Sequence, residues 1–320
     1  MHILFLNIIA TFLSCTIPVL SESADDTPPI DLRVLQWNIW EGGVHVNDYQ
    51  NKQVSIILNS GADIAGLEET TSDHATTIGQ QLGWYSWQSS KSVGIVSKYP
   101  IVEEYGEITR AGGVRVNVSK PNPKDNSSTI SKEVNLWSIH TEAYPYGPYE
   151  FCYNHLSDQE VTGNETSCER LPQVEQTLEG IQGQIDAAGN GSGPPIVFTG
   201  DFNAPSHLDW TANASSLHCG YEYAWPTSVA AINHGLLDSF RTVNPDPFKV
   251  PGTTWSPIYP YDSGTTGPVE PQDRIDFIYY KGLTPVDSHV VLVGHPQPYP
   301  NVSNNEWPSD HAAVLTHFLF

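Results

Sequence analysis

Short apolar runs alternating with polar turns dominate the chain after about residue 30. Residues 32–39 form the first strand-like run, and residues 49–59 follow with apolar side chains at helical spacing. A second strand and a second helix are predicted over residues 63–67 and 73–82. This alternation of strands and helices predicts a layered α/β fold.

The rest of the chain is richer in strands. Consecutive antiparallel strands are predicted over residues 92–97, 101–109, 113–118 and 134–140. One long helix is expected over residues 171–187, because apolar side chains recur there at helical spacing. Further strands are expected over residues 195–201, 236–240, 275–280, 286–293 and 312–318. We therefore expect an α/β fold in which two mostly antiparallel sheets pack together with helices outside.

Length and charge narrow the function. The 320 residues, of which 39% are apolar, can bury a large core, and no linker or repeat divides residues 31–320, so we expect one domain. The formal net charge is −22, and the 14 lysines and arginines are scattered. A nucleic-acid binder gains much of its affinity from cationic side chains. The charge therefore disfavours nucleic acid as a partner, although bound divalent cations can offset it locally.

The N-terminal segment predicts secretion. Residues 3–20 are mostly apolar but are interrupted by Asn7, Ser14 and Pro18, and small polar residues follow. This pattern is typical of a signal peptide over residues 1–23, and the alternative is a membrane anchor. We expect cleavage, a secreted glycoprotein and no remaining stable anchor. Sequons that agree with a secretory route begin at Asn117, Asn126, Asn164, Asn190, Asn213 and Asn301.

Cysteine placement suggests one disulfide. Cys15 leaves with the predicted signal peptide, and Cys152 and Cys168 flank the polar segment 154–167, which we expect to be a loop. We predict that these two cysteines are bonded and that Cys219 is a buried free thiol.

Polar residues that could act in catalysis or bind a metal stand at the ends of the predicted strands. They are Asn38, Glu69, His140, Asp201, Asn203, Asp276, Asp310 and His311. Cleavage of a phosphate ester requires a hard cation held by oxygen ligands, a base for water and donors for the growing charge. Neighbouring carboxylates repel one another by about 3 kcal/mol per pair at ~5 Å, and a divalent cation removes this penalty. Taken alone, Asp201 and Asn203 also fit an ordinary turn.

Motifs spread along the chain resemble the endonuclease/exonuclease/phosphatase superfamily, whose fold is that of deoxyribonuclease I. They occur in the order found in that family: Trp37-Asn38, Leu67-Glu68-Glu69-Thr70, Ile139-His140, Gly200-Asp201-Phe202-Asn203, Leu237-Asp238-Ser239-Phe240-Arg241, Arg274-Ile275-Asp276-Phe277 and Ser309-Asp310-His311. The resemblance covers roughly residues 31–320. It implies a four-layer α/β/β/α sandwich and hydrolysis of phosphate esters.

The resemblance also implies a metal site. Glu69 is then the principal ligand, and Asn38 and Asp310 lie near the cation. Mg²⁺ is the expected cofactor, and Mn²⁺ and Ca²⁺ are alternatives.

The same resemblance assigns catalytic groups. Asp201 and Asn203 orient or deprotonate the attacking water, and Asp276 holds His311 against the phosphate. His140 protonates or polarises the leaving oxygen. The base is either Asp201 or His311. Asp238 is expected to fix a helix or loop rather than to touch substrate.

The substrate stays open at this level. We expect a secreted, monomeric, metal-dependent phosphoesterase acting on a phosphate mono- or diester. Its main binding partner is then its phosphate-ester substrate. The alternatives are a nuclease, a sphingomyelinase-like lipid phosphodiesterase and an inactive binding protein. Loops 144–169 and 250–273 are expected to set the choice.

Several side chains are candidates to line the cleft. Segment 141–149 either walls the pocket or is a rigid connector whose tyrosines pack on a sheet. The tryptophans expected at the cleft are Trp40, Trp255 and Trp307. If the substrate is a small phosphate ester, the candidates for basic residues near its phosphate are Arg110, Arg115 and Arg274.

Overall fold

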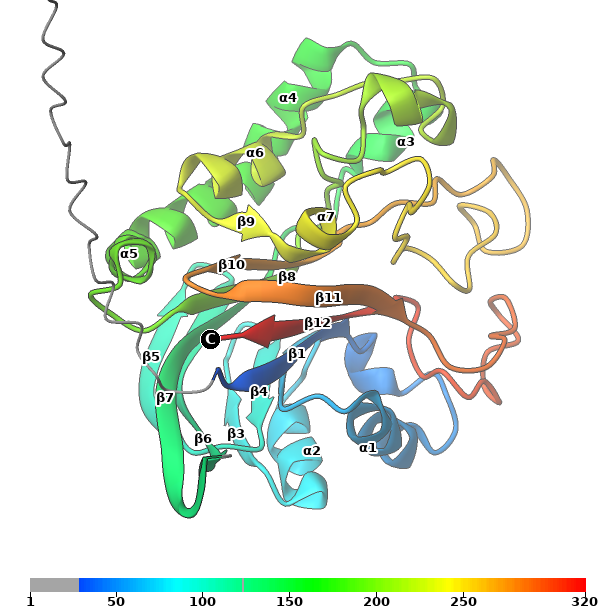
Figure 1. Cartoon of the computed structure of the whole chain (residues 1–320). Helices are drawn as coiled ribbons and strands as arrows, with labels where there is room; N and C mark the ends of the chain where they lie inside the picture. The colour runs from blue at the N-terminus through cyan, green and yellow to red at the C-terminus, as the bar shows by residue number, and fades with distance from the viewer. Residues whose placement is uncertain (1–28, 123) are drawn as a thin grey trace, which may run out of the picture.

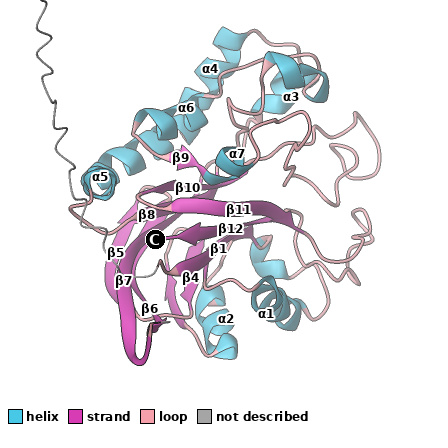
Figure 2. Ribbon diagram, in the orientation of Figure 1, coloured by secondary structure: helices cyan, strands magenta, loops and turns pink. Residues whose placement is uncertain are grey.

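Two six-stranded sheets packed face to face form the centre of the molecule. The computed structural model describes residues 29–122 and 124–320, so the predicted signal peptide lies outside the described residues. Helices cover the outer face of each sheet, which gives the expected four-layer arrangement (Figure 1, Figure 2). The predicted fold class is therefore confirmed.

The first sheet has the strand order β11-β12-β1-β2-β4-β3. Its β1 and β2 are parallel, and its other neighbouring pairs are antiparallel. In chain order the strands are β1 (Asp31–Asn38), β2 (Ile64–Glu68), β3 (Tyr85–Gln88), β4 (Val93–Ser97), β11 (Thr284–Val291) and β12 (Ala313–Leu319).

The second sheet repeats this arrangement with the order β5-β6-β7-β8-β10-β9. Here β7 and β8 are parallel, and the other neighbours are antiparallel. The strands are β5 (Ile101–Ile108), β6 (Ala111–Asn122), β7 (Asp125–His140), β8 (Ile196–Asp201), β9 (Leu237–Asp238) and β10 (Asp276–Lys281). Each sheet is mixed but mostly antiparallel, as predicted.

The helices fall into two groups. Helices α1 (Tyr49–Ser60) and α2 (His74–Leu82) lie on the first sheet, and α5 (Arg170–Asn190) and α6 (Pro226–Asn233) lie on the second. The remaining helical elements are α3 (Gly147–Cys152), α4 (Asp158–Ser167), α7 (Ser239–Val243) and the 3-10 turns η1 (Glu41–Gly43) and η2 (Ala212–Leu217). None of the helices in the described part of the chain combines the length and apolarity that crossing a bilayer requires.

Three apolar layers hold the sandwich together. Val34, Val114 and Val197 belong to the cluster between the sheets, where each is fully buried. Leu178 and Ile181, on the apolar stripe of α5, pack against the outer face of the second sheet. A matching cluster joins α1 and α2 to the first sheet. The helical spacing seen in the sequence is thus the spacing of buried contacts.

Two predicted elements differ from the structure. The strand expected over 236–240 stops after Asp238, because the Asp238 side chain accepts a hydrogen bond from the Arg241 backbone N–H and caps α7. This is the structural role expected for Asp238. The predicted loop 154–167 contains α4, which begins with a capping box formed by Ser157 and Glu160.

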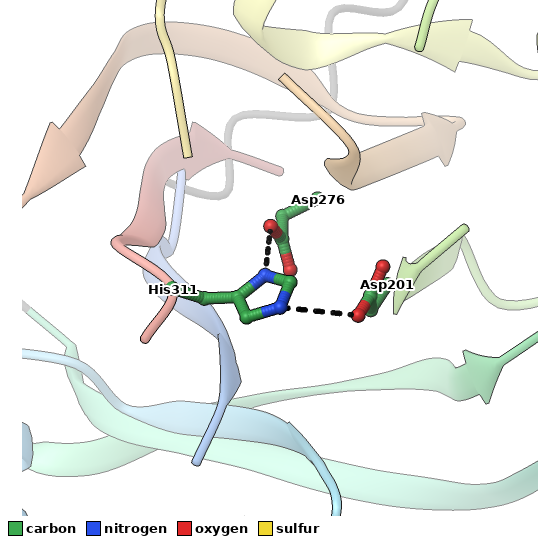
Figure 3. Close-up of side chains that lie close together, drawn as sticks. All are labelled: Asp201, Asp276 and His311. Atoms are coloured by element: carbon green, nitrogen blue, oxygen red, sulfur yellow. Dashed lines mark hydrogen bonds and ion pairs between the residues drawn. The ribbon is translucent and has the colours of Figure 1, made fainter. Parts of the chain in front are cut away.

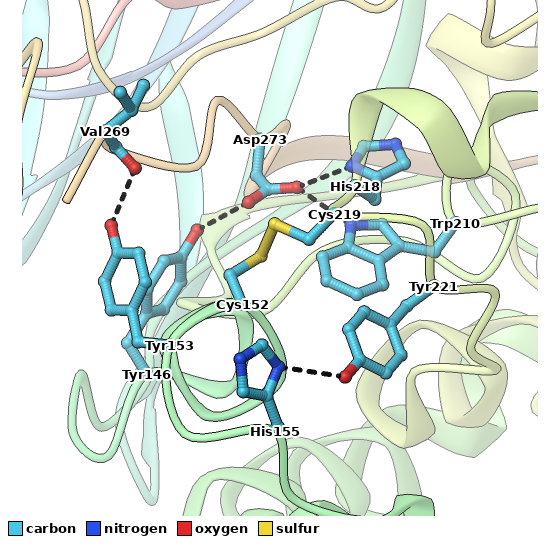
Figure 4. The surroundings of a disulfide bond; sticks show 10 residues. All are labelled: Tyr146, Cys152, Tyr153, His155, Trp210, His218, Cys219, Tyr221, Val269 and Asp273. Carbon is cyan, nitrogen blue, oxygen red and sulfur yellow. Dashed lines mark hydrogen bonds and ion pairs between the residues drawn. A yellow bond between two sulfur atoms is a disulfide. The ribbon is translucent and has the colours of Figure 1, made fainter.

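The cysteine prediction was wrong. Cys152 is bonded to Cys219, with a Cα–Cα distance of 5.5 Å, and Cys168 is free (Figure 4). Cys168 stands at the C-terminal end of α4, where its thiol faces the carbonyl oxygen of Glu165 in the same helix. Because the segment before it is a helix, it needs no covalent closure. The bond instead joins α3 to the turn after η2.

The disulfide gives a stability prediction. Closing the 67-residue separation between the two cysteines is expected to contribute about 4 kcal/mol through the entropy of the unfolded chain. Cys152→Ser should therefore lower the free energy of unfolding by a few kcal/mol, and Cys168→Ser, its matched control, should change it little. Denaturant unfolding and non-reduced peptide mapping measure both effects. A Cys152–Cys168 peptide, or equal losses in the two variants, would contradict the pairing.

Candidate active site

The strand register gathers the polar residues at one edge of the sandwich. In the parallel pair β1 and β2, Asn38 lies opposite Glu68, so Glu69 follows directly at the strand end. In the parallel pair β7 and β8, His140 lies opposite Asp201. Antiparallel β10 starts at Asp276, which also faces Asp201. Parallel strands end at the same edge, and this places residues distant in sequence side by side.

A cavity of about 490 Å³ opens at this edge. It is lined by most of the predicted site residues: Glu69, His140, Asp201, Asn203, Asp310 and His311. The other two, Asn38 and Asp276, lie behind the lining and hydrogen-bond to it. All the predicted site residues therefore converge, and Glu69 and Asp310 share one cavity.

Asn38 holds two carboxylates in place. Its amide nitrogen donates to Glu69 Oε1 at 3.1 Å and to Asp201 Oδ2 at 2.9 Å. Its amide oxygen accepts from the Trp40 backbone N–H at 2.9 Å. The second oxygen of Glu69 accepts from the Glu41 backbone N–H at 2.5 Å. In this arrangement Asn38 orients the acids, and its oxygen is already occupied.

Asp310 has the properties of a cation ligand. It is buried, and its Oδ1 has no hydrogen-bond partner among the described residues; His311 Nε2 lies 4.0 Å away. Burial, with a contribution from the negative charge of Glu69, raises the pKa of Asp310 to about 8, although His311 opposes the shift. A buried carboxylate oxygen without a donor, near a second carboxylate, suits a hard divalent cation. The donor set therefore fits the metal that the motifs imply.

A buried ion pair occupies the centre of the site. His311 Nδ1 is 2.8 Å from Asp276 Oδ2, and His311 Nε2 is 3.6 Å from Asp201 Oδ2 (Figure 3). Burial acts to lower the pKa of His311, but the charges of Asp276 and Asp201 outweigh it and raise the pKa well above its usual value. Burial also raises the pKa of Asp201, while His311 acts against this shift.

These three side chains could themselves be considered as metal ligands, because their atoms lie within 4.8 Å of one another. However, His311 Nδ1 already contacts Asp276 at 2.8 Å, so these two side chains are paired with each other, whereas Asp310 Oδ1 has no hydrogen-bond partner among the described residues. We therefore place the candidate cation at Glu69 and Asp310.

His140 and Asn203 flank Asp201. His140 Nε2 lies 3.7 Å from Asp201 Oδ2 and 3.9 Å from Glu69 Oε1, and its Nδ1 lies 3.5 Å from Ser92 Oγ. The Asn203 backbone N–H donates to Asp201 Oδ1 at 2.9 Å. Asn203 has a left-handed backbone, with φ of 47°, a conformation that asparagine tolerates better than most residues.

Sequence reasoning missed the support under the site. Glu68 is fully buried between the sheets, where it accepts from Ser138 Oγ at 2.6 Å and from Gln36 Nε2 at 2.7 Å. Gln36 Nε2 also donates to Asp276 Oδ1 at 2.7 Å, so this network fixes the partner of His311. Burial raises the pKa of Glu68 well above its usual value. The adjacent acids Glu68 and Glu69 were the sequence feature that could have revealed this network. Neighbouring residues of a strand point to opposite faces, so the two acids could not both face the cavity.

The predicted lining is partly correct. Trp40 and Trp255 line the cavity, but Trp307 does not: it is buried, and its indole N–H donates to the His311 carbonyl at 2.6 Å. Segment 141–149 is a wall of the cavity, since Tyr144 and Tyr149 line it.

The predicted phosphate-binding arginines do not reach the cavity. Arg110 pairs with Glu142, and Arg115 pairs with Glu103 and Glu133 on the second sheet. Arg274 is buried and pairs with carboxylates outside the site, Asp209 and Asp238. Each of these arginines is paired with a carboxylate of the protein. Their positive charge by itself therefore did not indicate a place near the phosphate.

Comparison with known proteins agrees with this fold. An uncharacterized protein of Caenorhabditis elegans is 28% identical over 339 residues and aligns with 100% of this chain and 99% of its own length. Truncated TDP2 from C. elegans has a TM-score of 0.55 at 15% identity, covering 91% of this chain and 98% of its own.

Two further solved structures have the same fold. D. rerio TDP2 complexed with single strand DNA product has a TM-score of 0.53 at 15% identity, covering 90% and 98% of the two chains. The human nocturnin catalytic domain with bound sulfate anion has a TM-score of 0.52 at 16% identity, covering 91% and 94%. The model of the endonuclease/exonuclease/phosphatase family matches residues 35–311, from the first strand to the histidine of the buried ion pair. This chain belongs to the endonuclease/exonuclease/phosphatase family.

Proposed function

We propose that the protein is a secreted, divalent-metal-dependent phosphoesterase that hydrolyses a phosphate mono- or diester by direct attack of water. One observation carries the proposal: two carboxylates suited to a cation, Glu69 and Asp310, share a cavity with His311, which Asp276 holds from behind. Family membership supports the reaction class, since the family comprises endonucleases, exonucleases and phosphatases.

Mg²⁺ is the proposed cofactor, with Mn²⁺ and Ca²⁺ as alternatives. Glu69 and Asp310 would hold it, and when bound it would neutralise charge on the phosphoryl oxygens. Asn38 would keep Glu69 and Asp201 in position through its amide nitrogen.

The side chains suggest how the bond is cut. Water attacks phosphorus, and its proton passes to Asp201, which Asn38 and Asn203 orient. As the new P–O bond forms, the bond to the leaving oxygen breaks, and that oxygen takes a proton from His140. The products are an alcohol and a phosphate carrying one ester group fewer. Proton transfer by positioned groups of this kind contributes about 10²- to 10⁴-fold to rates.

The base is Asp201 in this proposal. His311 is held next to Asp276 and its pKa is raised by the charges of Asp276 and Asp201, which favours its protonated form, so it is better suited to donate to a phosphoryl oxygen than to accept a proton. Asp201 is the remaining acceptor near the leaving-group histidine.

Secretion and monomeric state belong to the same proposal. The disulfide between Cys152 and Cys219 suits an oxidising compartment, and the sequon residues Asn190, Asn213 and Asn301 are exposed. TDP2 was solved with a DNA product, which keeps nucleic acid as an alternative substrate. Among the described residues, however, the cavity lining includes no lysine or arginine, and the net charge is −22.

Removal of the proposed ligand or base should abolish turnover. Glu69→Gln and Asp201→Asn should each lower kcat by about 10²- to 10⁴-fold, because each removes a charge needed for chemistry and leaves the shape unchanged. The measurement is hydrolysis of p-nitrophenyl ethyl phosphate and p-nitrophenyl phosphate with Mg²⁺, with and without chelator. The matched control is Glu133→Gln, an exposed carboxylate on β7. Undiminished activity in excess chelator would refute the metal mechanism.

The apo protein should lose stability as pH rises. The usual pKa of an aspartate is 3.8 and that of folded Asp310 is about 8, so the folded state binds more protons between these values and its stability falls across that window. The pKa of His311 is raised well above its usual 6.5. The stability that its charged form contributes is therefore also lost as pH rises, in the same direction as the effect of Asp310.

Asp310→Asn isolates this effect. In chelator at pH 9 it should raise the midpoint of thermal unfolding by about 5 °C relative to wild type, because a buried charge that His311 offsets only in part is gone. At pH 5, where Asp310 is protonated, the two proteins should unfold at similar temperatures. Mg²⁺ should stabilise wild type at pH 9 more than the variant. A variant equally destabilised at both pH values would contradict this account of Asp310.

A further inference from the structure

Aromatic side chains wall the cavity beside the catalytic groups. We call Tyr144, Tyr146, Tyr149, Trp255, Tyr259 and Tyr299 the aromatic wall. Its rings contact one another in series: the centroids of Tyr146 and Tyr149 are 4.9 Å apart, and Tyr259 lies 5.3 Å from Trp255 and 5.5 Å from Tyr299. The contacting rings thus form two groups, which meet where Tyr149 and Trp255 both donate to Glu270, and Tyr144 stands exposed beside them.

Buried carboxylates stand behind this wall. Glu270, which is 2% exposed, accepts a hydrogen bond from Tyr149 Oη at 2.8 Å and from Trp255 Nε1 at 2.6 Å. Asp273 is 1% exposed and accepts from Tyr146 Oη at 3.4 Å, as Figure 4 shows. Each of these donors belongs to an aromatic ring of the wall. Asp273 also lies 3.2 Å from His218 Nδ1, so the negative charge at the ring edges that has no ionic partner among the described residues is that of Glu270.

The charge of Glu270 is not neutralised by a neighbour. No ion pair to Glu270 occurs among residues 29–122 and 124–320, and within the same ranges no lysine or arginine lines the cavity. Asp262 adds another carboxylate to the lining. The side chains there that can carry positive charge are His140 and His311, which belong to the catalytic end.

Aromatic rings with a buried carboxylate behind them favour the binding of a cation. The faces of aromatic rings attract cations, and tryptophan and tyrosine surfaces are well suited to quaternary ammonium groups, which are weakly hydrated. Negative charge behind the rings strengthens this attraction, and it repels additional phosphates. The Trp255 and His311 ring centroids are 4.9 Å apart, so a cation on the wall lies beside the phosphate end of the cavity.

We propose that the aromatic wall binds an organic cation of the substrate, which makes the substrate a choline phosphodiester. Choline suits the layout because two carbons separate its ammonium group from the phosphate. The inference rests on the proposed phosphoesterase function for the phosphate half of the substrate, and the wall can be tested without that function.

The decisive test is binding of choline without catalysis. Isothermal titration calorimetry of the full-length mature protein in chelator compares choline with 3,3-dimethyl-1-butanol, which has the same shape but no charge. The titration is done at pH 8.5, because burial raises the pKa of Glu270 to about 7, despite its hydrogen bonds from Trp255 and Tyr149, and the group is then ionised. Choline should bind about tenfold more tightly than the neutral compound.

Variants locate the binding. Tyr144→Leu removes a ring that is 70% exposed, and Glu270→Gln removes the charge while keeping the shape; each should weaken choline binding by about five- to tenfold. Tyr85→Leu, in an exposed tyrosine of β3 outside the cavity, should leave it unchanged. Equal affinity for the two compounds, or an equal loss in Tyr85→Leu, would overturn the proposal.

Turnover then separates the two proposals and identifies the source of the choline group. With Mg²⁺, wild type should hydrolyse p-nitrophenyl phosphocholine with about tenfold higher kcat/KM than p-nitrophenyl ethyl phosphate. Choline binding at the wall with neither ester hydrolysed would support the wall and refute the phosphoesterase. Hydrolysis of the ethyl ester with no preference for the choline ester would support the phosphoesterase and refute the choline site at the wall. Phosphatidylcholine vesicles and soluble glycerophosphocholine, assayed in parallel, distinguish a lipid headgroup from a free metabolite.

Discussion

Repulsion among buried carboxylates is the constraint on which the site depends. The sandwich brings Glu69, Asp201, Asp276 and Asp310 to one edge, where the three aspartates are buried and Glu69 is partly exposed to the cavity. Two of these acids obtain compensation inside the protein, because His311 lies between Asp201 and Asp276. Asp310 Oδ1 has no hydrogen-bond partner among the described residues, and His311, 4.0 Å away, offsets its charge only in part. The fold is thus arranged so that a cation at Glu69 and Asp310 completes the balance of charge.

The two sheets make this convergence possible through a shared feature. Each is mostly antiparallel but has one parallel pair near its middle, and both pairs end at the active-site edge. Glu68 and Gln36 lie beneath that edge and connect the sheets through Ser138 and Asp276. Buried polar groups are costly to leave unpaired, so the bonds that Gln36 Nε2 and Ser138 Oγ make to Glu68 and Asp276 favour this register of the two sheets around the site.

Much of this was predictable from sequence, for reasons that particular residues illustrate. Strand ends such as Asn38 and Asp201 were identifiable because apolar runs stop there, and Val174 and Leu178 predicted the buried face of α5. The disulfide was not predictable, because its partner depends on where the turn after η2 places Cys219. Arg274 was misjudged because its counter-charges, Asp209 and Asp238, approach only in the folded chain.

The central claim is that one divalent cation lies between Glu69 and Asp310. Anomalous scattering from a crystal of the protein soaked in Mn²⁺ measures this directly. The account predicts a single strong peak within bonding distance of a carboxylate oxygen of each residue. A peak at Asp201, Asp276 and His311 instead, or no peak in the cavity at saturating Mn²⁺, would contradict it.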